Sequence, residues 1–143
     1  MKKNSAILKL SLLAGAIYFF LVSVAHLSGL KIPGLYIYFE IPSYSYQDNI
    51  VALLALGWAI FFYTAFIDPL KNIALVKAIL TAGAAAIIIL CMINIKTNFL
   101  LFNNSANIKI IWLEITILFC YWLLLVVFYF RIRWIKALKP NKL

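Results

Sequence analysis

Residues 110–130 read IIWLEITILFCYWLLLVVFYF, a run of apolar and aromatic side chains in which Glu114 is the only charged residue. Its length matches the roughly 20 residues that an α-helix needs to cross a hydrocarbon core of about 30 Å. A helix is expected rather than a strand, because a lone strand in lipid would leave its backbone groups unpaired. The stretch therefore predicts a membrane-spanning helix.

Three further runs have the same character: Leu10 to Leu27, Ile50 to Ile67 and Ile73 to Ile93. The composition agrees, since 66% of the 143 residues are apolar and 12% are charged. A soluble domain has about a quarter of its residues charged, and a small fold cannot hide so much apolar surface. We expect one domain over residues 1–143, an all-α integral membrane protein with four transmembrane helices.

The lysine and arginine residues are distributed unevenly over the ends of these runs. Ten lie before the first span, at the second connection or after the fourth span: Lys2, Lys3, Lys9, Lys71, Lys77, Arg131, Arg133, Lys136, Lys139 and Lys142. Three lie in the other two connections: Lys31, Lys96 and Lys109. The positive-inside rule then places both termini in the cytoplasm. We expect a multi-pass protein of the cell (inner) membrane, folded as an antiparallel bundle because the connection at residues 68–72 is short.

The net charge of +9 follows from this same placement. The basic carboxyl-terminal segment is expected to meet anionic lipid headgroups, so the bilayer is the expected partner and nucleic acid is not. The first run also has the layout of a secretory signal, with small residues at Ser23-Val24-Ala25. Cleavage is the alternative there, but the apolar run continues past that site as a full span.

Small residues recur in the third span at Ala78, Ala82 and Ala86, with Gly83 beside them, and more briefly in the first at Ser11 and Gly15. Such spacing lets two helix backbones approach closely in lipid. Packing within one chain is the favoured interpretation. A homo-oligomer or a larger membrane complex is the alternative.

The connection between the first two spans is aromatic and is interrupted by prolines. Residues 35–41 alternate strictly, which predicts an extended outer loop whose Tyr36, Tyr38 and Glu40 face water. Ser45 and Asp48 have the spacing of a capping box, so Asp48 is expected to cap the second span, with a role as a functional acid as the alternative. Similarly, Asp68 and Pro69 predict the N-cap and first residue of the third span.

Two ionisable residues inside the spans are hard to explain structurally. Glu114 lies within the fourth span, where an acid is costly unless it is protonated or paired. His26 lies near the outer end of the first span, at a similar depth, so a hydrogen-bonded His26–Glu114 pair is predicted beneath the outer loop. The candidate binding residues are thus His26, Glu114, Tyr38 and Glu40. A purely structural pair, or a Glu114 that bonds Lys109 or a loop amide, is the alternative.

The chain carries no recognisable catalytic or cofactor motif. A single histidine does not make a metal site, and the chain has no glycine-rich phosphate loop and no nucleophile elbow. We therefore assign no catalytic residue, metal or cofactor. In size and in the apolar loop after its first span, the chain resembles the DoxX-type membrane proteins, a resemblance of layout that implies no activity.

Three functions follow as hypotheses. The first is an accessory or assembly subunit, or a small oligomer, without enzymatic activity. The second is the binding or transport of a small lipophilic or proton-coupled solute near His26 and Glu114. A membrane enzyme using those two residues as acid and base ranks last.

Overall fold

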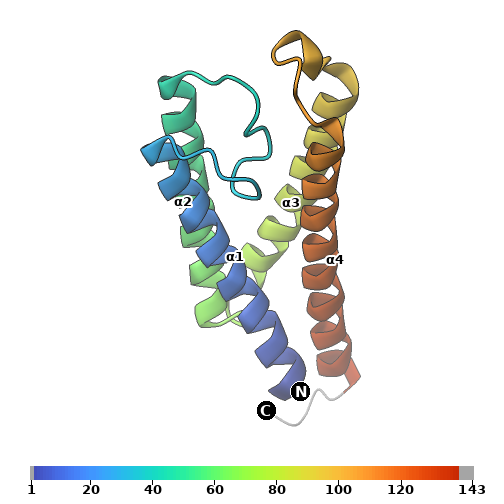
Figure 1. Cartoon of the computed structure of the whole chain (residues 1–143). Helices are drawn as coiled ribbons and strands as arrows, with labels where there is room; N and C mark the ends of the chain where they lie inside the picture. Colours follow the sequence, from blue (N-terminus) through green and yellow to red (C-terminus); the bar gives the residue numbers. More distant parts are fainter. Residues whose placement is uncertain (1, 139–143) are drawn as a thin grey trace.

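The computed structural model describes the backbone of residues 2–138 and the side chains of residues 6–134. Four long helices follow one another: α1 (Lys2–Ser28), α2 (Ser45–Ile67), α3 (Ile73–Lys96) and α4 (Ile108–Leu138), with a short 3₁₀ helix η1 (Phe99–Leu101) before α4 (Figure 1). Each of the four is long and apolar enough to cross a membrane, and no strand occurs in the described part. The predicted all-helical fold with four candidate spans is confirmed.

The two ends of the molecule differ in what they carry (Figure 1). The loop end holds residues 29–44, which join α1 to α2, and residues 97–107, which join α3 to α4. The terminal end holds the start of α1, the end of α4 and the turn at residues 68–72. The contact between α1 and α2 is the most extensive, while α4 contacts both α1 and α3.

Close packing of α1 on α2 comes from alanines. Ala52, Ala55 and Ala59 of α2 are buried at steps of three and four residues, and Phe62 and Ala65 continue the same buried face. Small side chains at this spacing allow helix axes to approach, which in lipid replaces the missing hydrophobic drive. The sequence pattern predicts close helix approach through small residues in the third span. In the structure, the most extensive helix contact is the one between α1 and α2.

Two of the small residues, Gly83 of α3 and Gly15 of α1, pack within the chain. A side chain at Gly83 would meet Trp122 of α4, and one at Gly15 would meet Tyr121 of α4 and Phe62 of α2. Both α4 aromatics are fixed by hydrogen bonds across the interface. Trp122 Nε1 donates to the Leu80 carbonyl at 2.8 Å, and the Tyr121 hydroxyl donates to the Ser11 carbonyl at 2.7 Å.

The turn between α2 and α3 differs from the prediction. Asp68 does not cap α3. Its carboxylate accepts the N–H groups of Leu70 and Lys71, both at 3.1 Å, and so stabilises a turn instead. The helix begins at Ile73, preceded by Asn72, so the predicted N-cap at Asp68 and helical Pro69 were wrong. The reason is local: an aspartate at the end of one helix binds the nearest free N–H groups, which here belong to the turn.

The 29–44 connection is also not extended. It is a succession of turns, in which the Ile32 carbonyl accepts the N–H groups of Leu35 and Tyr36 and the Tyr38 carbonyl accepts that of Ile41. The expected alternation of exposure is absent, since Tyr36 is only 4% exposed. The prediction of a wet tyrosine face was wrong, because tertiary contacts of the rings outweigh the period-2 pattern.

Candidate functional site

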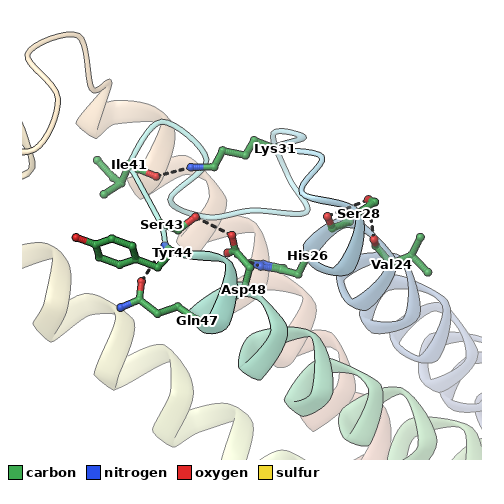
Figure 2. Close-up of polar contacts among 10 residues, drawn as sticks. Val24, His26, Ser28, Lys31, Ile41, Ser43, Tyr44, Gln47 and Asp48 are labelled. Carbon is green, nitrogen blue, oxygen red and sulfur yellow. Dashed lines mark hydrogen bonds and ion pairs between the residues drawn. The ribbon is translucent and has the colours of Figure 1, made fainter.

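A histidine and an aspartate meet at the loop end. His26, near the end of α1, lies with Nδ1 3.2 Å from Oδ1 of Asp48, near the start of α2. The other carboxylate oxygen accepts the Ser43 hydroxyl at 2.8 Å (Figure 2). Both members of the pair are largely buried, with side chains 10% and 14% exposed. They are brought together because α1 and α2 pack side by side and the 29–44 connection joins these two ends.

This arrangement overturns the predicted capping box. Asp48 directs its carboxylate to two side chains rather than to the backbone N–H groups of its own helix. The start of α2 is served by Gln47, whose side-chain oxygen accepts the Tyr44 N–H at 3.3 Å (Figure 2). The spacing of Ser45 and Asp48 fits a capping box, but the Asp48 carboxylate bonds His26 of the neighbouring helix instead.

The pairing also fixes the tautomer of His26. An ionised carboxylate only accepts hydrogen bonds, so Nδ1 must carry the hydrogen that lies between the two groups. In the neutral ring, Nε2 is then a bare acceptor. His26 therefore presents a hydrogen-bond acceptor on the side of its ring away from Asp48.

Tyr36 covers the histidine. Its ring stacks on the imidazole with ring centres 3.5 Å apart and planes inclined by 22°. Burial raises the pKa of Tyr36 to about 12, and the negative charge of Asp48 adds to the rise. The Tyr36 hydroxyl is buried close to the Asp48 carboxylate, although no hydrogen bond of ordinary length and angle joins the two groups. A neutral phenol in this position keeps its proton and remains a potential donor.

Beneath the connection lies a cavity of about 460 Å³. Residues 35–38 and 41–43 cover it, α1 and α2 contribute His26, Gln47 and Asp48, and mostly apolar side chains of all four helices form the rest. Tyr38 also borders the cavity, with its ring stacked on Phe99 of η1 at 5.2 Å and its hydroxyl buried without a partner. Burial raises the pKa of Tyr38 above its ordinary value. A volume of roughly 300–1,000 Å³ is typical of small-molecule sites.

Glu114 lies beside this cavity but not with His26. Its Oε1 accepts the Gly34 N–H at 2.8 Å, and its Oε2 is buried without a partner. It borders a separate cavity of about 60 Å³ together with Tyr18 and Gly34. Among the described residues no hydrogen bond joins His26 to Glu114, so the predicted direct pair was wrong. A loop amide holds Glu114, as one of the alternatives anticipated, and Asp48 takes the histidine.

Glu40 serves the loops rather than the cavity. Its carboxylate accepts the Asn107 N–H just before α4, and its main-chain oxygen accepts the Asn103 side-chain amide at 2.9 Å. A carboxylate at a helix N-terminus satisfies a free N–H group and the helix dipole. Glu40 thereby ties the two connections of the loop end to each other, and it does not line the 460 Å³ cavity.

The four candidate binding residues are therefore separated by the fold. His26 and Tyr38 both line the 460 Å³ cavity. Glu114 lines the separate 60 Å³ cavity, and Glu40 lines neither of the two. Tyr36 was missed as a site residue, and Asp48 was predicted mainly as a helix cap, with a role as a functional acid only as the alternative. The position of Asp48 in the sequence could have indicated the pair. Asp48 lies near the start of α2 and His26 near the end of α1, and residues 29–44 join these two helix ends. No sequence signal identified Tyr36, because alternation placed it on the exposed face.

Chemically, the site is suited to binding. Ser43, Asp48 and His26 resemble the members of a hydrolytic triad, but Ser43 bonds Asp48 instead of His26 Nε2, so no base activates the hydroxyl. In the described part, no three His, Cys, Asp or Glu side chains gather as metal ligands. The cavity is bordered by His26, by the buried phenols of Tyr36 and Tyr38, and by walls that are mostly apolar.

Comparison of the chain with protein-family models, with curated proteins and with solved structures finds no match. Function is therefore inferred from the geometry of the loop end. The four apolar helices indicate a membrane protein, and the residues that line the cavity indicate what it could bind.

Proposed function

We propose that the four helices form an antiparallel transmembrane bundle with both termini in the cytoplasm of a cell (inner) membrane. The support is the placement of cations: Lys71, Arg131 and Arg133 are at the terminal end, together with Lys9 of α1. The 29–44 connection is then on the outer side. In this orientation the 460 Å³ cavity is at the depth of the outer leaflet.

We propose further that the protein binds a small lipophilic molecule with a polar group in this cavity. One observation carries the proposal: a mostly apolar cavity is bordered by His26 and by Tyr38, whose buried hydroxyl has no hydrogen-bond partner. A buried polar group without a partner costs about 1–3 kcal/mol. A ligand with both a donor and an acceptor would satisfy these groups, while its apolar part fills the remaining volume.

The proposal favours binding over proton coupling. A proton-coupled site at His26 and Glu114 would need the two groups to exchange a proton. Instead, each is held by a different partner, Asp48 for the histidine and Gly34 for the glutamate. Transport of the bound molecule is compatible with this site, because the cavity lies between the helix pairs.

The test is to purify the full chain in a mild detergent and identify small molecules that copurify by mass spectrometry. Tyr38→Phe removes the unpartnered hydroxyl and keeps the ring on Phe99. Tyr44→Phe is the matched control, because Tyr44 is 68% exposed and does not border the cavity. We expect one class of amphipathic molecule to be retained by the wild type and by Tyr44→Phe, and several-fold less by Tyr38→Phe.

Two results would contradict this function. One is a purified protein that retains only bulk phospholipid in proportion to the membrane of origin. The other is equal retention by Tyr38→Phe and Tyr44→Phe with unchanged thermal unfolding, which would place the retained molecule elsewhere.

A second candidate, an accessory subunit or small oligomer, has its own observation. Ala78 of the α3 stripe is exposed, as are Ala74 and Ala85 on either side of it, whereas Ala86 borders the loop-end cavity and Gly83 is covered by Trp122. An exposed small-residue face suits another transmembrane helix. Replacing Ala78 by Leu should weaken any oligomer seen by cross-linking in membranes, whereas Leu53→Ala on exposed α2 should not.

A further inference from the structure

A second groove lies at the terminal end, between α3 and α4. It has a volume of about 820 Å³, larger than the loop-end cavity, and is distinct from it. Its deep part is apolar and aromatic, with Leu80, Trp122 and Val126 among the lining residues. Trp122 is held there by its hydrogen bond to the Leu80 carbonyl. The wall is therefore a preformed surface on the lipid-facing side of the helix pair.

Two cations border the same groove. Lys77 comes from the first turns of α3 and Arg133 from the last turns of α4, and both side chains are exposed. Arg133 Nη1 donates to the hydroxyl of Tyr129, another lining residue, at 3.3 Å. This bond keeps the guanidinium at the groove. Trp134, which is 72% exposed, lies beside it as an interfacial aromatic.

No side-chain carboxylate is available to neutralise these cations. The chain has four acidic residues against 13 lysines and arginines. Each acid is engaged elsewhere: Glu40 with Asn107, Asp48 with His26 and Ser43, Asp68 with the turn of residues 70–71, and Glu114 with Gly34. None of the four side-chain carboxylates forms an ion pair with Lys77 or Arg133, so both cations are open to an anionic group from outside the protein.

We propose that this groove binds one anionic phospholipid of the leaflet at the terminal end. An acyl chain lies along the apolar wall against Trp122, and the phosphate lies between Lys77 and Arg133. The charge pattern selects an anionic lipid such as phosphatidylglycerol, because phosphatidylcholine brings its own cation to a site that already holds two. A guanidinium suits a phosphate through paired N–H donors, and an ammonium through its charge. The site does not depend on the loop-end ligand proposed above.

The experiment measures lipid affinity on the full chain by native mass spectrometry, with added phosphatidylglycerol or phosphatidylcholine. The test variant is Lys77→Gln with Arg133→Gln. The matched control is Lys71→Gln with Arg131→Gln, which removes two exposed cations from the same end that do not line the groove. Lys136, Lys139 and Lys142 remain in every variant, so their general attraction for anionic lipid is common to all.

We expect the test variant to lose phosphatidylglycerol affinity by roughly fivefold per cation removed, and the control variant to lose much less. Phosphatidylcholine affinity should change little in either. Each variant loses one polar contact, the Arg133–Tyr129 hydrogen bond in the test variant and the Lys71–Asp68 ion pair in the control, so thermal unfolding of both is measured alongside to confirm that they are folded. Equal losses in both variants would overturn the proposal and leave only diffuse surface charge. Equal affinity of the wild type for the two lipids would overturn it as well.

A second measurement locates the acyl chain. Phosphatidylglycerol brominated on its acyl chains should quench the fluorescence of the wild type in bilayers more than brominated phosphatidylcholine at the same mole fraction. The excess should disappear in Trp122→Phe but persist in Trp112→Phe, whose tryptophan lies at the other end of α4. Inorganic phosphate should not remove it. Displacement by phosphate, or an excess that Trp122→Phe leaves intact, would contradict the placement of the lipid.

Discussion

The Oε1 atom of Glu114 accepts the backbone N–H of Gly34 at 2.8 Å, across 80 residues of sequence. The bond fastens α4 to the connection between α1 and α2. Gly34 has a φ of +83°, a backbone conformation that side-chain-bearing residues rarely adopt. The only acid within the span of α4 thus has a structural partner, which the charge pattern of the sequence did not indicate.

Gly34→Ala should therefore destabilise the protein. A β-carbon in the left-handed region costs about 1–2 kcal/mol, and relief of that strain would turn the N–H away from Glu114. The measurement is the free energy of unfolding in detergent. Gly57→Ala is the control, because Gly57 is helical with no atom within 4 Å of the added carbon, and it should stabilise α2 by about 0.5–1 kcal/mol. Equal effects of the two variants would show that the loop does not hold its conformation.

The effect of a Glu114 substitution on stability should depend on whether the new side chain can still accept the Gly34 N–H. Glu114→Gln keeps a side-chain oxygen for the Gly34 N–H, so we expect near-normal stability. Glu114→Ala leaves that N–H without a partner and should cost about 1–3 kcal/mol. Unfolding in detergent compares the two. A large loss in Glu114→Gln would mean that the negative charge itself is required.

Gly83→Ala should disturb the contact of α3 with α4. The added carbon would lie 2.9 Å from Cδ1 of Trp122, and the hydrogen bond to Leu80 limits how far the indole can move. Overpacking of this kind costs about 1–3 kcal/mol. The double variant with Trp122→Phe should lose less than the sum of the single variants, because both act on one contact. Strict additivity of the unfolding free energies would contradict the packing described.

The turn at Asp68 should contribute a pH-dependent part of the stability. Hydrogen bonds from the backbone N–H of Lys71 and then of Leu70 lower the pKa of Asp68 below its ordinary value. A lowered pKa in the folded state gives a contribution that is complete above the unfolded pKa of about 4 and is lost as pH falls through the folded value. The stability difference between wild type and Asp68→Asn should therefore shrink as pH is lowered from about 6 to about 3. A difference that stays constant over this range would exclude the carboxylate charge as its source.

The proposed orientation has a direct test. Reporter fusions after Lys71 and after Lys139 should be active as cytoplasmic domains, and fusions near Glu40 and Asn103 as outer domains. Lys71→Gln alone should not change which fusions are cytoplasmic and which are outside, because the other cations of the terminal end remain. A cytoplasmic result at Asn103 would contradict the four-span topology.

The sequence by itself determined the class of fold. Whether a run crosses a membrane depends on its length and on the transfer of its own side chains into lipid, which is a local sum over about 20 residues. The runs beginning at Leu10, Ile50, Ile73 and Ile110 each lie within one of the four helices. Depth along a span was also readable, and it correctly marked His26 as a residue of the loop end.

Only the tertiary structure decided which groups meet. Depth places His26 and Glu114 at a similar level, but the rotation of each helix and the path of residues 29–44 determine their neighbours. Those depend on the alanine face that joins α1 to α2, which brought Asp48 to the histidine. The partner of Glu114 was a main-chain N–H, a group that every residue except proline carries, so no side-chain pattern could distinguish Gly34.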